Sequence, residues 1–194
     1  MWKIVPAERA VPFLAVMYPR SLEEFLLVEI EKIALKLFKP VGFQKATGVS
    51  KFLFGPVGFS EFTNYYDEEI GGEVGKIYVV LPRRFDPSHL AGVKLRSNRL
   101  ERMWASMIAR KFSWNSSRPI NLDPGYLTAS KLILASTKNY FHRIYLGRGI
   151  YAEVTLFYRK KSFQPFEWTY PDYAEEGFRK WLKDVRNSIK DLLF

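Results

Sequence analysis

The sequence contains no cysteine. Disulfides, thiolate nucleophiles and thiolate metal sites are therefore excluded, and a chain without thiols fits a reducing compartment, so we expect a cytoplasmic protein. Histidine is also scarce, with only His89 and His142, and the acidic stretch at residues 67–69 is typical of a solvated loop. We therefore predict no metal site. A Gly-x-Ser-x-Gly motif is absent, which leaves a serine hydrolase unsupported and the question of enzymatic activity open.

Long apolar runs are absent as well. The first apolar run, residues 11–19, is too short to cross a bilayer and has neither a basic leader nor a small-residue cleavage site. We interpret it as a first strand and predict no membrane association. A chain of 194 residues with 47% apolar residues is long enough for one sizeable core, so we expect a single domain over residues 1–194.

Positive charge is concentrated in the middle of the chain. Residues 94–161 hold fourteen Lys and Arg but only three acidic residues, a net charge of +11, whereas the other residues together carry −1. Such an asymmetry bears on binding partners rather than on fold. It predicts a basic face for an anionic partner, unless the charges only form a solvated surface.

The spacing of apolar residues predicts three helices. Residues 21–38 begin with a Ser-x-x-Glu capping box at Ser21. A second helix starts at Asp86, followed by proline at its first helical position, and runs to residue 109. The third helix, residues 174–193, is amphipathic and could pack on the sheet or on a second copy of the chain. A homodimer through this helix is therefore one possible assembly.

A β-hairpin over residues 142–159 is the clearest strand signal. Two alternating runs flank the loop at residues 147–149, which places Arg143 opposite Glu153 as a cross-strand ion pair. Further strands are expected at residues 11–19, 50–54 and 76–81. The order of elements predicts an α+β fold, a mostly antiparallel sheet with helices packed on it, and it fits a ferredoxin-like core followed by a C-terminal hairpin and helix.

The stretch Asp123-Pro124-Gly125 predicts a turn. Proline presets the second position, glycine permits a positive φ at the third, and the aspartate side chain bonds to the turn's own amides. In this interpretation Asp123 makes the turn, and the alternative is a functional carboxylate in an active-site loop. A short helix at residues 129–137, capped by Thr128, would follow it and present free amides to an anion.

The candidate site combines these cations and polar groups. The candidate anion-binding residues are Arg118, Lys131, Lys138, Arg143 and Arg148, and the candidate polar site is Asp123, Thr128 and His142. Basic residues alternate with tyrosines in this region, a pairing that follows phosphates and stacks bases. We therefore expect an anionic partner, nucleic acid or a nucleotide. The alternatives are an enzyme acting on a small phosphorylated metabolite or a structural protein without a catalytic site, and no cofactor can be assigned.

Three stretches resemble one known family. Residues 121–173, which contain Asp-Pro-Gly-Tyr-Leu-Thr and His-Arg-Ile-Tyr-Leu, are similar to the prokaryotic family of domain of unknown function 4416, as are residues 62–72 and 95–101. The resemblance implies one domain of this size and supplies no established activity. Some members bear the label GTP-binding protein. The stretch nearest to a phosphate-binding loop, residues 71–77, has Ile77 where Ser or Thr is required, so we predict no GTP hydrolysis.

Overall fold

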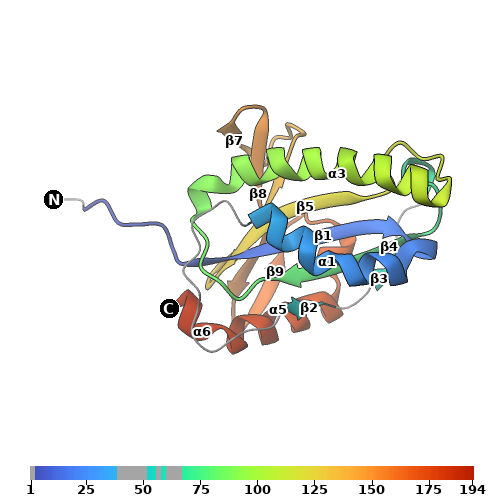
Figure 1. Cartoon of the computed structure of the whole chain (residues 1–194). Helices are drawn as coiled ribbons and strands as arrows, with labels where there is room; N and C mark the ends of the chain where they lie inside the picture. Colours follow the sequence, from blue (N-terminus) through green and yellow to red (C-terminus); the bar gives the residue numbers. More distant parts are fainter. Residues whose placement is uncertain (1–2, 39–51, 56–57, 60–66) are drawn as a thin grey trace.

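The computed structural model describes residues 3–38, 52–55, 58–59 and 67–194. Its strands form one antiparallel sheet in the order β2-β4-β1-β5-β6-β8-β7, with β3 paired to β4 and β9 to β8 (Figure 1). The strands are β1 Ala10–Pro19, β2 Leu53–Phe54, β3 Gly58–Phe59, β4 Val74–Val80, β5 Asn121–Thr128, β6 Lys131–Ser136, β7 Ile144–Gly147, β8 Ile150–Arg159 and β9 Ser162–Pro165. The helices are α1 Glu23–Phe38, α2 Asp67–Ile70, α3 Leu90–Phe112, α4 Pro171–Ala174, α5 Glu176–Ser188 and α6 Lys190–Leu193.

The first half of the sheet has the connectivity of a ferredoxin-like core. Strands β2, β4, β1 and β5 are neighbours in that order, α1 connects the β1 and β2 positions in sequence, and α3 lies between β4 and β5. Strands β6, β8 and β7 extend this core beyond β5. The α+β fold expected from the sequence is confirmed, and no helix in the described part of the chain combines the length and apolarity needed to cross a membrane.

Alternation along β1 divides the core between two faces of the sheet. Leu14 and Val16 pack under α1 and α3, whereas Phe13 and Ala15 pack against the C-terminal helices on the other face (Figure 1). The apolar side of α5, which includes Leu182, is buried against this second face. The helix residues that suggested a homodimer therefore cover the sheet, and the dimer stays a prediction.

The starts and ends of the helices follow the sequence signals only in part. Asp86 accepts a hydrogen bond from the amide of Ser88, as an N-cap should, and α3 continues to Phe112. A 3-10 turn begins the first helix after Pro19, so Ser21 lies within this turn rather than at the predicted cap. The strand predicted at residues 50–54 is described only for its second half, as β2.

Two predictions for residues 123–137 are wrong. Asp123-Pro124-Gly125 lies inside β5, and residues 131–136 form β6 instead of a helix. The turn comes between these two strands, where the Thr128 hydroxyl accepts hydrogen bonds from the amides of Ser130 and Lys131, at 3.1 Å each. A hydroxyl that accepts hydrogen bonds from the following amides occurs both at helix caps and in tight turns. The local sequence at Thr128 therefore fits a helix start as well as the turn that is observed.

Position 125 requires a glycine because two strands lie close together there, and not because of a positive φ. A Cβ at this position would lie 2.0 Å from the carbonyl oxygen of Ile133 on β6. The close approach of the two backbones there explains why the strand contains a glycine, a residue that otherwise weakens strands.

The predicted hairpin is confirmed, with a bulge at its tip. Ile144 pairs with Ala152, but Gly147 pairs with Ile150 because the register shifts after Tyr145. Arg148 occupies the loop with a φ of 55°. The hairpin projects beyond α3 at the end of the sheet (Figure 1).

We predict that Gly125→Ala lowers the free energy of unfolding by about 3 kcal/mol, because the added methyl group overpacks the β5–β6 contact. Gly177→Ala in α5 is the matched control, since a Cβ there meets its nearest atom at 3.7 Å. The control should keep or slightly raise stability. Chemical denaturation of both variants decides this, and equal stabilities would show that the β5–β6 backbones can separate without loss.

Candidate functional site

Strand β5 has an open edge along its first half. It pairs with β1 over Asn121–Thr128, but with β6 only over Gly125–Leu127. Two side chains of α3 make the hydrogen bonds that the Leu122 backbone needs on this edge. Lys94 donates to the Leu122 carbonyl at 2.9 Å, and the Leu122 amide donates to Glu101 at 2.9 Å. Two residues further, Pro124 has no amide hydrogen and needs no acceptor.

Lys94 and Glu101 reach the same edge because they are seven residues apart, which is about two helical turns. Both are buried, and Ser97 between them is buried as well. Lys94 also donates to Asp123 at 3.1 Å, so its ammonium group bridges a carbonyl and a carboxylate. A buried ammonium requires partners of this kind to offset the loss of water.

The electrostatics of this edge differ between its two acids. Burial alone would raise the pKa of Asp123, but Lys94 and Lys76, with hydrogen bonds from Lys94 and Asn121, hold it below its usual value. Burial raises the pKa of Glu101 above its usual value, although Lys94 and Arg118 oppose that shift. Asp123 is therefore an ionised structural partner of the edge, rather than the turn residue expected from the sequence.

A second buried ion pair anchors the hairpin. Glu153 accepts from Arg143 at 2.7 Å and lies 3.2 Å from the His142 ring, which itself stacks on Trp168. Thr155 donates to the other oxygen of Glu153. The predicted Arg143–Glu153 pair is thus present, and it lies at the base of the hairpin.

The five predicted anion-binding residues do not meet in one place. Arg118 pairs with Glu69 at 2.7 Å and with Glu101 at 3.3 Å, while Lys131 pairs with Glu8 at 2.9 Å. Arg143 is engaged by Glu153. Of these five residues, Lys138 and Arg148 have exposed side chains that no acid of the described part of the chain pairs with. Anion binding by these residues stays a prediction, and Lys131 stands on a strand rather than on the expected helix.

The outward side of α3 carries a row of cations that the sequence reasoning counted but did not place. We call the cations along α3 the α3 face: Arg96, Arg99, Arg102, Arg110 and Lys111. Arg99, Arg102 and Arg110 are its exposed outward members, whereas Arg96 is half-buried and donates to the Leu37 carbonyl of α1 at 3.0 Å. The only acid of the helix, Glu101, is buried on the opposite side. The spacing of 96, 99, 102 and 110 within a helix was the signal that could have revealed a common face.

The hairpin tip continues the α3 face. A Cβ built on Gly92 of α3 would lie 3.4 Å from the guanidinium of Arg148 and 3.9 Å from that of Arg96. Burial, and then the nearby positive charge of Arg148, lower the pKa of Arg96. Two guanidinium groups held this close repel each other and would be stabilised by an anion between them.

Other polar groups lie on the far side of the sheet, near Asp123. Asp172 accepts from Lys76 and from the Tyr78 hydroxyl at 3.0 Å. The neighbouring Tyr173 hydroxyl is buried and has no hydrogen-bond partner in the described part of the chain. Its pKa is raised well above the usual value by burial, and then by negative charges that include Asp172 and Asp123. Among the described residues, no group of three or more His, Asp or Glu could hold a metal ion.

The comparisons with known proteins point to one family. The family model described as domain of unknown function (DUF4416) matches residues 24–189, which confirms the resemblance found in the sequence. Comparison with curated proteins and with solved structures found no match.

We predict that Lys94→Met lowers the free energy of unfolding by about 3 kcal/mol, because it leaves the Leu122 carbonyl without its donor and the half-buried Asp123 carboxylate without its charge partner. The control, Arg99→Met, changes an exposed residue of the same helix and should stay within about 0.5 kcal/mol of the parent protein. Thermal or denaturant unfolding measures both. If Lys94→Met unfolds like its control, side chains of α3 do not close the β5 edge.

Proposed function

We propose that this chain, which belongs to the DUF4416 family, binds nucleic acid through the α3 face and the adjoining hairpin tip. The family description names no activity, so the proposal rests on geometry and charge. A nucleic-acid partner also agrees with the net charge of +10 and with the cytoplasmic location that the lack of cysteine predicts.

The observation that supports the proposal most is a row of exposed cations with no acid among them. Arg99 and Arg102 are exposed, and no hydrogen bond or ion pair within the described residues engages either side chain. Arg110 only donates to the backbone of its own helix. Other cations of the segment 94–161, such as Arg118 and Lys131, are paired with acids and contribute less free charge.

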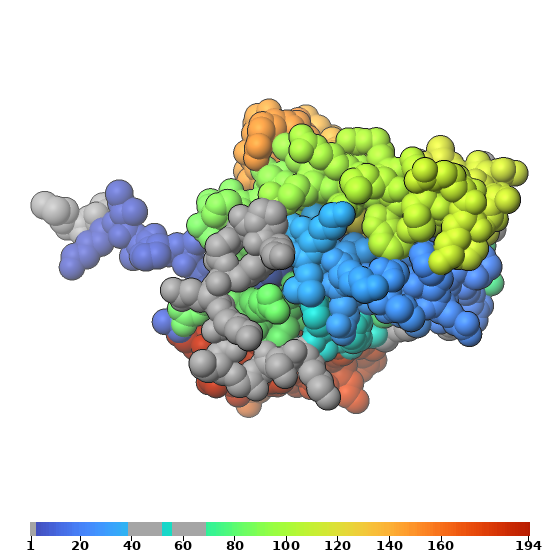
Figure 2. Space-filling model, in the orientation of Figure 1, coloured from blue at the N-terminus to red at the C-terminus, as the bar shows by residue number. Residues whose placement is uncertain are grey.

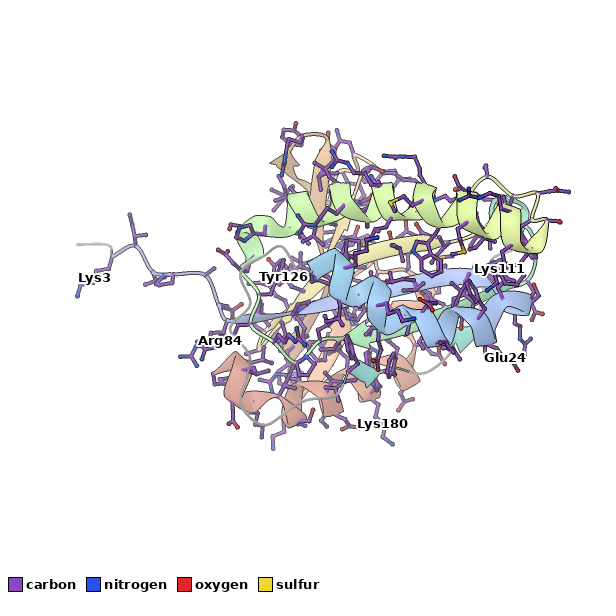
Figure 3. All side chains as sticks on the ribbon, viewed as in Figure 1. Lys3, Glu24, Arg84, Lys111, Tyr126 and Lys180 are labelled. Carbon is purple, nitrogen blue, oxygen red and sulfur yellow. The ribbon has the colours of Figure 1, made fainter. Side chains whose placement is uncertain are left out.

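The length of the α3 face suits an extended anion. From Arg96 to Arg110 the helix rises about 21 Å, at about 1.5 Å per residue. This length equals about six nucleotide steps at about 3.4 Å each. At the far end, the exposed Lys111 lies over the Phe25 ring of α1 at 4.3 Å, and Figure 3 labels it where α3 and α1 come together. A small phosphorylated metabolite would use only a fraction of this row.

A small-ligand site near Asp123 is the second candidate, and one observation favours it. The Asp123 side chain keeps 31% of its surface accessible although Lys94 beside it is only 4% accessible, and the Tyr173 hydroxyl nearby has no partner. The cations of this region are already paired, Lys76 with Asp172 and Lys94 with Asp123. The region therefore offers less free positive charge to a phosphate than the α3 face does.

For the second candidate we predict that Tyr173→Phe keeps or raises the free energy of unfolding by up to about 1 kcal/mol, because it removes a buried hydroxyl that lacks a partner. Such a result would leave the hydroxyl available for a ligand. A clear loss of stability in calorimetry would instead assign the hydroxyl to the folded structure and remove the main support for a ligand there.

For the α3 face we predict that Arg99→Glu combined with Arg102→Glu weakens binding of labelled oligonucleotides at least tenfold at low salt, since each lost phosphate contact also loses its counterion release. The loss should be similar for different base sequences, because phosphate contacts position the ligand without specifying it. Fluorescence anisotropy over a range of salt concentrations measures both the affinity and the salt slope.

The matched control makes the same change of charge on the other side of the sheet. Lys180→Glu with Lys190→Glu alters two exposed lysines of the C-terminal helices, and Figure 3 shows Lys180 on the side of the molecule opposite α3. The control should retain most of the affinity. Absence of oligonucleotide binding by the parent protein, or equal losses in both double variants, would contradict the proposed function.

A further inference from the structure

We infer that the nucleic acid is single-stranded and that its bases stack on an exposed aromatic surface at the β7 hairpin, an inference that rests on the proposed function. The exposed apolar side chains of this hairpin, here called the hairpin patch, are Tyr140, Phe141, Ile144, Tyr145 and Leu146. Ile144 pairs with Ala152 on the side of α3, and Tyr145 pairs with Tyr151 on the other side of the hairpin, so a ligand would meet the rings around the hairpin edge. The hairpin patch joins the α3 face at Arg148, so one strand could contact cations with its phosphates and rings with its bases.

The large apolar side chains of the hairpin patch are unusually exposed to solvent. The accessible fractions are 92% for Phe141, 71% for Ile144 and 58% for Tyr145, within a span of five residues. Figure 2 shows the hairpin projecting beside α3, away from the body of the molecule. A cluster of large apolar side chains on a projecting edge marks a binding surface in a soluble protein.

The rings of the patch are held in place from below. Phe141 meets the His142 ring edge-on at 5.0 Å, and His142 in turn stacks on Trp168. The Tyr145 ring packs against Tyr151 at 5.1 Å, and its hydroxyl accepts the amide of Gly149. The Tyr145 ring, held by a ring contact and a hydrogen bond, loses little conformational freedom on binding, which favours it as a stacking platform.

The charge around the patch favours an anionic occupant. Residues 136–152 contain no acidic residue, and their exposed cations are Lys138 and Arg148. Arg148 approaches Arg96 of the α3 face. Rings interleaved with unpaired cations are the arrangement by which proteins follow single strands, since every base has a face that can stack.

Two other occupants fit the patch less well. In a duplex the bases are already stacked on each other, so exposed rings would find no free base faces. A second copy could pair along β7, the last strand of the sheet. This would bring two chains of net charge +10 into contact at hairpins whose exposed charges are all positive, and the chains would repel each other. The experiment below tests for a duplex and for a second copy as well.

The test compares Phe141→Ala and Tyr145→Ala with Phe194→Ala, which removes an exposed ring at the C-terminus. The probes are a labelled oligothymidylate of about fifteen nucleotides, a duplex of equal length, and inorganic polyphosphate as a competitor without bases. We expect each hairpin variant to bind the single strand about tenfold more weakly. The salt slope should stay unchanged, because removal of a ring releases no counterion.

The other measurements separate this inference from the proposed function. Polyphosphate should displace the oligonucleotide from the parent protein and bind Phe141→Ala with unchanged affinity, since it uses only the α3 face. Single-strand binding that depends on Arg99 and Arg102 but not on Phe141 or Tyr145 would overturn the inference and leave the function standing. A parent protein that dimerises in sedimentation, and becomes monomeric in Phe141→Ala, would assign the patch to a second copy and overturn the inference as well. A parent protein that binds neither the oligonucleotides nor polyphosphate would instead refute the proposed function.

Discussion

The structure depends on how the open edge of β5 is closed. A strand edge inside a folded protein leaves backbone donors and acceptors that must find partners. Here Lys94 and Glu101 act in place of a neighbouring strand for Leu122, while Pro124 removes the next donor. The same two side chains fix the rotation of α3 about its own axis, because both must point at the sheet.

The fixed rotation of α3 determines which charges remain free. With Lys94 and Glu101 facing inward, the helix period turns Arg99, Arg102 and Arg110 outward. The basic segment is thereby divided into two groups. One group is neutralised within the fold, as in the pair between Arg143 and Glu153, and the other lies on the surface, where it can act on a partner.

The hairpin adds a different chemistry to the same side of the molecule. The buried pair between Arg143 and Glu153 ties its base to β8, and Ile150 packs with Leu90 and Ala91 at the start of α3. The tip is left exposed, so its rings and Arg148 stand next to the α3 face. A surface that joins free cations to fixed aromatic rings suits a polymer that is both charged and rich in flat bases.

The sequence by itself determined the α+β class, the first strand, the three helical regions and the hairpin with its Arg143–Glu153 pair. These features follow from local periods and from turn chemistry, which act over a few residues. Tertiary structure decided the rest. Whether Asp123 makes a turn or lies within a strand depended on the approach of Ile133 to Gly125. Arg118 and Lys131 are neutralised because Glu69 and Glu8 pair with them. Partners so distant along the chain leave no local pattern, and therefore only the folded structure separates paired charges from free ones.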